Sequence, residues 1–404
     1  MSVQGKRARM GRWAVSLLAA VAAFAIGMVT GKAADPVKIG FAMPKTGYLG
    51  VASPVALQAY ELWRDQVNAA GGLSIGGKAK RPVTFVWYDD QSVPTKTAQI
   101  YEKLITEDKV DLLLAPYGTP FHIAIAPVVE RHKFPIIGAA AASTLMRDLK
   151  VKYMFMAEVL PDRYGKSIPA FLESQGVKSV GMITLQLPLS LETKKYTVPN
   201  LKAAGIKVVV DDEYPVDIKD MTGMASALKS AKPDAVLGLT YPEDSVLYVN
   251  TAREIGFVNP IQFLLIGPSE PFFIKKFPAK DTEGFITMGH WAPTEARWPK
   301  AKPFYDAYVA KWHEPPDYLD SVISYVSCEI LQEAVAKVGL DHEKIRDAIA
   351  SDTFDTINGP VKFTNGEDLS LPAGLIQIQK GKLEVIWPKD IATAKFEPKS
   401  GWSK

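Results

Sequence analysis

Cysteine is almost absent from this chain of 404 residues, which has a single one, Cys328, in an apolar stretch with helical periodicity. A single cysteine excludes an intrachain disulfide, so the hydrophobic cores have to hold an exported chain of this kind together. Hydrophobic residues make up 47% and charged residues 23%, an ordinary balance for a globular protein. The length exceeds what one core accommodates comfortably and favours two lobes.

Enzymatic motifs are also lacking. The chain has no Gly-x-Ser-x-Gly and no His-Glu-x-x-His, and Gly165-Lys166-Ser167 lacks the earlier glycine of a phosphate loop because position 160 is leucine. The five histidines are scattered without metal-ligand spacing. Asp89-Asp90 ends a strand before a helix, where a turn and capping role is favoured over paired carboxylates. The sequence therefore predicts no enzyme, no metal site and no cofactor.

An excess of basic residues is absent once residues 1–34 are set aside. The whole chain has 47 Lys and Arg against 44 Asp and Glu, a net charge of +3. Residues 1–34 hold five of the basic residues and none of the acidic ones, so the net charge of the remainder is about −2. Since it also lacks a basic patch with interleaved aromatic residues, nucleic acid is not expected as a partner.

Residues 1–34 are predicted to be a secretory signal peptide. Four basic residues precede the uncharged apolar run Trp13 to Thr30, and small residues follow at Gly31-Lys32-Ala33-Ala34. The alternative is an uncleaved membrane anchor, because the run is about long enough to span a bilayer. No cysteine lies near the end of the segment, which argues against a lipid anchor. We expect a freely soluble periplasmic protein.

A strand–helix–strand unit near the start of the remaining chain indicates the fold class. Val83 to Tyr88 is rich in β-branched and aromatic residues, and Val110 to Ala115 is a second short apolar run. Between them, Ser92 as a cap and Pro94 in the first turn are typical of a helix start. Such a unit predicts a parallel sheet, in which ligands bind beyond the carboxyl ends of the strands. The loop Tyr117 to Phe121 is therefore the first candidate for a site.

The alternation of strand and helix restarts at Pro161, which indicates a second lobe of the doubly wound α/β type. After Phe285 helices follow one another without strands between them. The chain then ends in a predicted hairpin of Leu375 to Gln379 and Leu383 to Ile386. Two similar halves joined by irregular segments suggest two lobes with a cleft between them.

Four loops at strand ends occupy matching positions in the two expected lobes. Their small residues allow a ligand to approach backbone N–H groups, and helix N-termini bind carboxylates without a counter-charge. Tight turns need the same residues for backbone reasons, so each loop alone is weak evidence of a site. The loops are Tyr117-Gly118-Thr119-Pro120, Ala139 to Ser143, Tyr241-Pro242-Glu243 and Gly267-Pro268-Ser269-Glu270.

Several motifs carry a family resemblance. From Val37 to about Pro388 the chain resembles the leucine/isoleucine/valine-binding proteins of bacterial ABC importers. The motifs are Lys38-Ile39-Gly40-Phe41 with Thr46-Gly47, Asn68-Ala69-Ala70-Gly71-Gly72-Leu73, Tyr88-Asp89-Asp90-Gln91-Ser92-x-Pro94 and Phe354-Asp355-Thr356-Ile357-Asn358-Gly359-Pro360-Val361.

The resemblance implies the type I periplasmic binding fold. In this α/β fold two doubly wound, three-layer lobes are joined by three hinge crossings, and the ligand lies in the cleft between the lobes. The crossings are expected near 156–160, 288–291 and 356–361. We expect lobe 1 to comprise 35–157 and 290–357, and lobe 2 to comprise 158–289 and 358–404.

The resemblance also implies ligand-binding residues. Thr119 would supply the hydroxyl for the ligand carboxylate, and Ala140 would offer backbone donors, with Ser143 as a substitute for a missing threonine hydroxyl. Ser269 falls where the family has the acidic residue that holds an ammonium group, and Glu270 is adjacent. Tyr241 and Tyr325 match the family's tyrosines. Aromatic side chains that could stack on a ring are Tyr48, Tyr117, Phe121, Tyr241 and Trp291, the last being equally well explained as core.

The implied function is capture of a small solute by hinge closure and delivery to an inner-membrane permease, by a monomer. Branched-chain or other hydrophobic amino acids are the family default. If Glu270 does not reach the ligand, a buried ammonium is unsupported, and an aromatic or aliphatic carboxylate becomes the alternative. A sensor for a separate signalling partner and an amidase-like hydrolase are further alternatives, and no nucleophile–base set supports the hydrolase.

Overall fold

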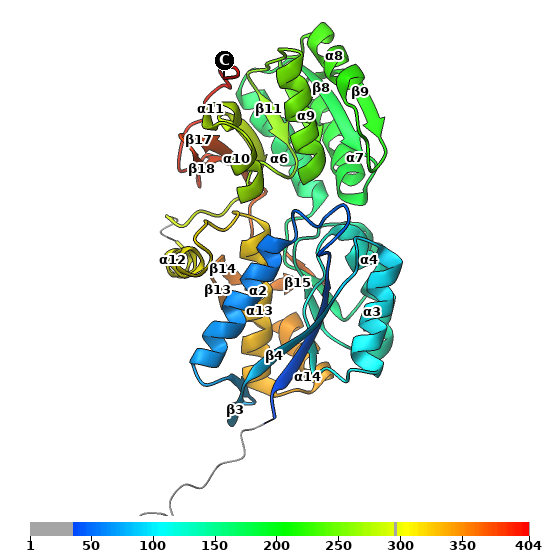
Figure 1. Ribbon diagram of the computed structural model, residues 1–404, viewed down its shortest axis with the longest axis vertical. Coiled ribbons are helices and arrows are strands. Elements are labelled where there is room, and N and C mark those ends of the chain that lie inside the picture. The colour runs from blue at the N-terminus through cyan, green and yellow to red at the C-terminus, as the bar shows by residue number, and fades with distance from the viewer. Residues whose placement is uncertain (1–34, 295–296, 404) are drawn as a thin grey trace, which may run out of the picture. The chain divides into compact units, whose positions relative to one another are not determined.

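The computed structural model describes residues 35–294 and 297–403 (Figure 1). The signal peptide expected at 1–34 lies outside the described residues. None of the helices in the described part combines the length and apolar character needed to cross a bilayer.

The predicted parallel βαβ unit is confirmed. Strand β1 (Val37–Met43) pairs in parallel with β4 (Val83–Asp89) on one side and with β5 (Leu112–Leu113) on the other. Helix α3 (Pro94–Thr106) connects β4 to β5 and buries its apolar face. The side chains of that face are Ile100, Tyr101, Leu104 and Ile105.

The capping role predicted for Ser92 is wrong. Helix α3 begins after Val93 with no side-chain cap, although Pro94 occupies the first turn as expected. The Ser92 hydroxyl donates to the Thr46 carbonyl at 3.0 Å and accepts from the Leu49 amide at 3.0 Å. It therefore joins the loop after β1 to the loop after β4, because a partner distant in sequence competes with the local helix end.

The turn role expected for Asp89-Asp90 is confirmed. The Asp89 carboxylate accepts from the backbone amides of Lys45, Thr46 and Gln91 and from the Thr46 hydroxyl. Both loops beside the first strands are thus fixed by one carboxylate.

The rest of lobe 1 is a second sheet with the strand order β15-β16-β7-β6, flanked by helices. Helices α2 (Pro54–Ala69) and α13 (Asp320–Val338) pack side by side, as Figure 1 shows. Cys328 is buried in α13. The other elements are β2 (Leu73–Ile75), β3 (Ala79–Arg81), α4 (Thr119–His132), β6 (Ile136–Gly138), α5 (Leu145–Leu149), β7 (Met154–Met156), α12 (Ala301–Trp312), α14 (His342–Ser351), β13 (Phe354–Thr356), β14 (Gly359–Val361), β15 (Phe363–Thr364) and β16 (Glu367–Asp368).

Lobe 2 is built on one sheet with the order β18-β17-β12-β11-β10-β8-β9. The strands up to β12 run parallel, and the predicted C-terminal hairpin of β17 and β18 adds an antiparallel edge. Its elements are α6 (Pro161–Ser174), β8 (Ser179–Leu185), α7 (Pro188–Ala203), β9 (Lys207–Tyr214), α8 (Thr222–Ala231), β10 (Ala235–Leu239), α9 (Pro242–Glu254), β11 (Gln262–Leu264), α10 (Pro271–Lys276), α11 (Ala279–Thr282), β12 (Phe285–Met288), β17 (Leu375–Gln379) and β18 (Lys382–Trp387).

The expected boundary of lobe 2 at residue 358 differs from the sheet pairing. Strand β16 pairs in parallel with β7 of lobe 1, with Glu367 opposite Met156. The Glu367 carboxylate also accepts from Arg147 of lobe 1 at 2.5 and 2.7 Å. Strand β16 and its antiparallel partner β15 therefore belong to a sheet of lobe 1, and the last crossing comes after Asp368 rather than at 356–361.

The second and third crossings touch each other. The Gly289 amide donates to the Gly374 carbonyl at 3.1 Å. A Cβ at Gly374 would lie 2.5 Å from the Gly289 oxygen, so the close approach requires glycine there. The first crossing, which contains Glu158, is held to lobe 1 by the Ala157 amide, which donates to the Gly138 carbonyl.

Candidate functional site

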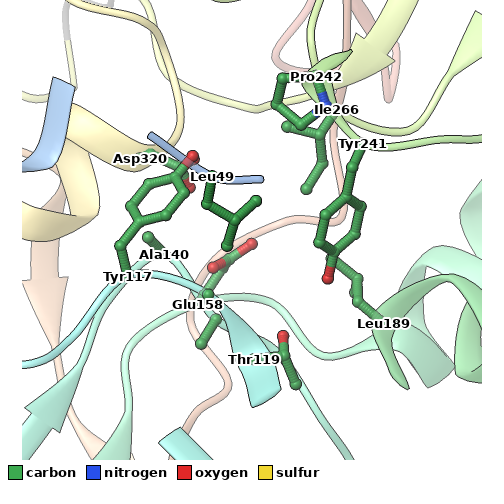
Figure 2. Close-up of a pocket in the computed structure, with 12 residues that line it drawn as sticks. Leu49, Tyr117, Thr119, Ala140, Glu158, Leu189, Tyr241, Pro242, Ile266 and Asp320 are labelled. Carbon is green, nitrogen blue, oxygen red and sulfur yellow. The ribbon is translucent and has the colours of Figure 1, made fainter. Parts of the chain in front are cut away.

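A small cavity lies between loops of the two lobes (Figure 2). Its volume is about 20 Å³, room for about one water molecule, so a solute fits only when the surrounding loops move apart. The residues that line it come from the strand-end loops of lobe 1, the first crossing, the start of α13 and three loops of lobe 2. They are Leu49, Tyr117, Gly118, Thr119, Ala140, Ala141, Glu158, Leu189, Tyr241, Pro242, Ile266 and Asp320.

Gly118 shapes the floor of the cavity just before α4. Its φ is +100°, and a Cβ there would lie 2.9 Å from Leu49 and 3.0 Å from Phe121. Glycine adopts this conformation without the strain that other residues meet. The turn brings Tyr117 and Thr119 to opposite sides of the Glu158 carboxylate in Figure 2.

The Thr119 hydroxyl is occupied within lobe 1. It donates to the Ala142 carbonyl at 3.2 Å and accepts from the Ala142 amide at 3.2 Å. Thr119 is also a hydrogen-bond neighbour of the Tyr241 hydroxyl. Burial raises the pKa of Tyr241, and the hydrogen bond with Thr119 lowers it by a smaller amount. Thr119 therefore fixes the loop Ala139 to Ser143 rather than presenting a free donor.

Glu158 brings a carboxyl group into the cavity from the first crossing. Its carboxylate points into the space between Tyr117 and Tyr241 in Figure 2, and the residue is only 3% exposed. Burial, followed by the negative charge of Asp320, raises the pKa of Glu158 well above its usual value, while a backbone hydrogen bond from Ala141 lowers it. Apart from the Ala141 backbone, no hydroxyl, amide or basic side chain within the described residues donates to this carboxylate.

Asp320 is the second carboxyl of the cavity and the first residue of α13. It accepts the Tyr117 hydroxyl at 2.7 Å. Nearby Asp317 caps the same helix, accepting from the backbone amides of Leu319, Asp320 and Ser321. Burial raises the pKa of Asp320, and the charge of Asp317 adds to that rise.

Glu270 is fully buried behind these groups and does not line the cavity. Among the described residues, neither of its carboxyl oxygens has a hydrogen-bond partner. Burial and the charges of Asp320 and Asp317 raise its pKa well above the usual range. Since an unpaired buried carboxylate is costly, the neutral acid is favoured as long as no cation is near.

These four side chains, which we call the carboxyl cluster (Glu158, Glu270, Asp317 and Asp320), have no basic counterpart. Within residues 35–294 and 297–403, no lysine, arginine or histidine lines the cavity. None is among the groups that shift the pKa of Glu158, Glu270 or Asp320. The described residues also contain no group of three or more side chains arranged to hold a metal ion.

Two sets of hydrogen bonds join the lobes beside the cavity. The Tyr48 hydroxyl of lobe 1 donates to the Asp244 carboxylate of lobe 2 at 2.6 Å. The Tyr48 ring also stacks on Tyr241, with centroids 6.4 Å apart and planes inclined by 22°. Burial raises the pKa of Asp244 to about 6 even though the Tyr48 hydroxyl lowers it.

The second set centres on Glu192 of α7. Its carboxylate accepts from the Ser143 hydroxyl at 2.5 Å, from the Thr144 amide at 2.6 Å and from the Thr144 hydroxyl at 2.7 Å. Three donors from one loop of lobe 1 thus surround one carboxylate of lobe 2. Because the donors lie on lobe 1 and the acceptor on lobe 2, these buried bonds join the two lobes in this structure.

The structure brings four of the ten predicted site residues together in the cavity, namely Tyr117, Thr119, Ala140 and Tyr241. Tyr48 and Phe121 lie next to it, the first against Tyr241 and the second against Gly118. Ser143 binds Glu192 instead of facing the cavity.

The remaining predicted residues lie elsewhere. Ser269 lines a separate depression with Tyr305 and Tyr318. The Tyr325 hydroxyl donates to Gln66 between α13 and α2, away from the cavity. Trp291 is fully buried and packs against Phe304 and Tyr318, so it belongs to the core.

Two acidic residues that line the cavity were not predicted from the sequence, Glu158 and Asp320. Glu158 is the only charged residue in the run Tyr153 to Pro161, which is otherwise apolar. Asp320 opens an apolar helix, where an acidic residue is readily attributed to the helix dipole. An isolated acid inside the expected first crossing was the signal available for Glu158.

Two α/β lobes, three crossings and a small cavity between strand-end loops define a two-lobed solute-binding protein. A family model described as periplasmic binding protein matches residues 36–382, and the chain belongs to this family. The proteins that the chain resembles are described as solute-binding proteins rather than as enzymes. This agrees with the lack of catalytic motifs.

Individual proteins similar to the chain carry related descriptions. The chain is 25% identical over 386 residues to the "Leu/Ile/Val-binding protein homolog 8" of Brucella abortus, covering 89% of this chain and 92% of the relative. It resembles in structure the branched-chain amino acid transporter substrate-binding protein LivJ from Streptococcus pneumoniae in complex with isoleucine. The TM-score is 0.76 at 22% identity, covering 88% of this chain and 100% of that one.

A second solved structure has a different ligand. A solute-binding protein of an ABC transporter from R. palustris, in complex with benzoate, matches with a TM-score of 0.75 at 19% identity. The match covers 91% of this chain and 98% of that one. These likenesses confirm the type I periplasmic binding fold that the sequence resemblance implied.

Proposed function

We propose that this protein is the solute-binding component of an ABC importer and that it captures a small solute bearing an amino group. The observation that carries the proposal is the lining of the cavity, in which Glu158 and Asp320 are buried with no basic residue among the described lining. A buried ammonium group needs an acidic partner, and this cavity offers two. Hydrophobic amino acids, the solutes expected from the family, are the first class to test.

Lobe closure is the proposed mechanism. A solute bound by one lobe gains contacts from the other lobe only in the closed state, so binding shifts the equilibrium by that difference in affinity. The bonds between Tyr48 and Asp244 and around Glu192 support such a closed state. Export through a cleaved signal peptide and delivery to a membrane permease complete the proposed role, with a monomer as the working form.

A solute without an amino group, such as benzoate, is disfavoured by the same lining. An anionic ligand beside Glu158 and Asp320 would either face like charges or require both acids to remain protonated. Because the similar R. palustris protein was solved in complex with benzoate, we include benzoate in the test.

The test is a thermal-shift measurement on purified residues 35–404. A ligand that binds only the native state raises the unfolding midpoint by mass action. Leucine and phenylalanine are compared with isocaproate and hydrocinnamate, which are the same acids without the amino group, and with benzoate. A rise with amine-bearing compounds supports the proposal. A rise with the deaminated acids or benzoate alone would refute it and restore the aromatic or aliphatic carboxylate.

A further inference from the structure

The place expected to hold the carboxylate of an amino acid is already occupied by groups of the protein. The Thr119 hydroxyl exchanges hydrogen bonds with the backbone of Ala142. The backbone donor of Ala141, on the loop expected to receive the ligand carboxylate, faces the Glu158 carboxyl. A ligand carboxylate at this point would therefore displace or confront Glu158.

The acidic residues around the cavity also disfavour a ligand that carries a carboxylate. A zwitterionic amino acid brings its own negative charge into a space lined by Glu158 and Asp320 and backed by Glu270. In a buried site of low dielectric such repulsion is strong. To avoid the repulsion, each carboxyl would have to stay protonated. The cluster instead has room for a donor, because neither oxygen of Glu270 has a hydrogen-bond partner among the described residues.

A cation without a carboxylate meets none of these obstacles. Its ammonium group can donate to Glu158, whose carboxyl points into the cavity from a residue only 3% exposed. The rings of Tyr117 and Tyr241 stand on either side of that carboxyl in Figure 2. Aromatic rings attract cations that approach their faces. Leu49, Leu189 and Ile266 supply apolar contact for a short hydrocarbon part.

We propose that the solute is a small organic amine that carries no carboxylate, with Glu158 holding its ammonium group at the position expected for an amino acid's carboxylate. This inference rests on the proposed function, because it narrows the class of amine-bearing solute. Asp320 would accept a second hydrogen bond from the same ammonium group or from a second amino group.

The experiment compares each amino acid with the amine that results from its decarboxylation, using thermal shift on residues 35–404 and then calorimetry. The pairs are leucine and isoamylamine, phenylalanine and phenethylamine, and lysine and cadaverine. We expect the amines to raise the unfolding midpoint and their parent amino acids to leave it nearly unchanged.

Each other outcome overturns the inference. If amino acids raise the midpoint and amines do not, the inference is wrong while the proposed function stands. If only the deaminated acids do so, both fail. A response to neutral acetamide or urea without any response to amines would show that hydrogen bonding, not charge, selects the solute. Silence of all three amines also overturns it.

A variant separates the role of Glu158 in binding from its role in folding. Glu158→Gln keeps the shape and removes the charge, so the affinity for the responding amine should fall about 30-fold or more. Its empty form should be at least as stable as the parent at pH 8, because a carboxyl with a raised pKa destabilises the fold there. Glu173→Gln, an exposed residue of α6, is the matched control. Unchanged affinity in Glu158→Gln would refute the assignment.

Proton release gives an independent readout. The titratable side chains that act on Glu158 or respond to it are Asp317, Asp320, Tyr164 and Tyr241. Because burial favours the protonated acid in the empty protein, an entering ammonium group should ionise it and release a proton. Calorimetry in two buffers of different ionisation enthalpy measures this release, which should vanish or fall in Glu158→Gln. If amine binding releases no proton from the parent protein, Glu158 is not its partner.

Discussion

Glu192 offers the sharpest test of lobe closure. Its carboxylate accepts three hydrogen bonds from Ser143 and Thr144 across the lobes, at 2.5, 2.6 and 2.7 Å. In Glu192→Gln the amide oxygen can take the place of the oxygen that accepts both Thr144 bonds, and the NH₂ group then faces the Ser143 hydroxyl, which has to turn to accept from it. The variant therefore turns three charge-assisted bonds of the closed state into weaker bonds between neutral groups.

The magnitude follows from those bonds. A hydrogen bond to a charged group contributes about 1.5–3 kcal/mol net and one between neutral groups about 0.5–1.5 kcal/mol, so three bonds that lose their charge weaken the closed state by about 3 kcal/mol. A difference of that size lowers the ratio of closed to open molecules about 100-fold. The open state is little affected, because there water satisfies either side chain.

The assay is a distance measurement by electron paramagnetic resonance between two spin labels on residues 35–404. Gln99→Cys on α3 and Ser226→Cys on α8 place one label on each lobe at exposed sites, and buried Cys328 escapes labelling. Glu192→Gln should shift the distance distribution of the ligand-free protein towards the open form. The control is Glu254→Gln, an exposed residue of α9.

The reasoning would be refuted by a distribution identical to that of the parent and the control. That result would mean that the bonds around Glu192 persist in the open state or contribute nothing to closure. Loss of folding is monitored separately by the thermal midpoint, which should stay close to the parent value because each lobe keeps its own core.

Two further predictions concern groups near the cavity. Tyr48→Phe removes the hydroxyl that donates to Asp244 at 2.6 Å and should lower the ratio of closed to open molecules about tenfold in the same labelled protein; an unaltered distribution would contradict this. Asp320→Asn tests the buried acid, since burial and then Asp317 raise the pKa of Asp320 to about 7. The folded state binds the proton of Asp320 more tightly than the unfolded state does. The free energy of unfolding of the parent should therefore fall by about 4 kcal/mol relative to that of the variant as pH rises from 4 to 8. Urea unfolding across that range measures it, and parallel pH profiles of parent and variant would contradict it.

The general architecture was accessible from the sequence because it rests on local patterns. The runs Val83 to Tyr88 and Val110 to Ala115 predict strands from composition alone, and Pro94 fixes a helix start through its own backbone. The C-terminal hairpin was found for the same reason, since its strands are short and separated by a glycine turn.

Long-range pairing was less accessible. Strands β15 and β16 are two residues each, and their place beside β7 depends on contacts such as the bond from Arg147 to Glu367, which are 220 residues apart. The Ser92 hydroxyl likewise forms its hydrogen bonds with the loop after β1 and not with the start of helix α3. No local pattern records such competition between near and distant partners.

The site was reached in part by the same logic. Strand-end loops meet at one edge of a parallel sheet, so Tyr117, Thr119 and Ala140 could be placed together without coordinates. Glu158 and Asp320 could not, because a single acid in an apolar run or at a helix start has ordinary structural explanations. Their significance depends on the absence of a basic partner within the described residues, which is a property of three-dimensional packing.

Under the proposed function, the position of Glu158 would connect the charge of the solute to closure of the lobes. It lies in the first crossing, directly after Ala157, whose amide is bonded to lobe 1, and shortly before α6 of lobe 2 begins. In the open state water can solvate both a cation and this carboxylate. Closing adds Tyr241, Leu189 and Ile266 from lobe 2, excludes that water and strengthens the ion pair. A cation would therefore favour closure through the hinge itself, whereas a neutral ligand would gain only the contacts of the lobe 2 loops.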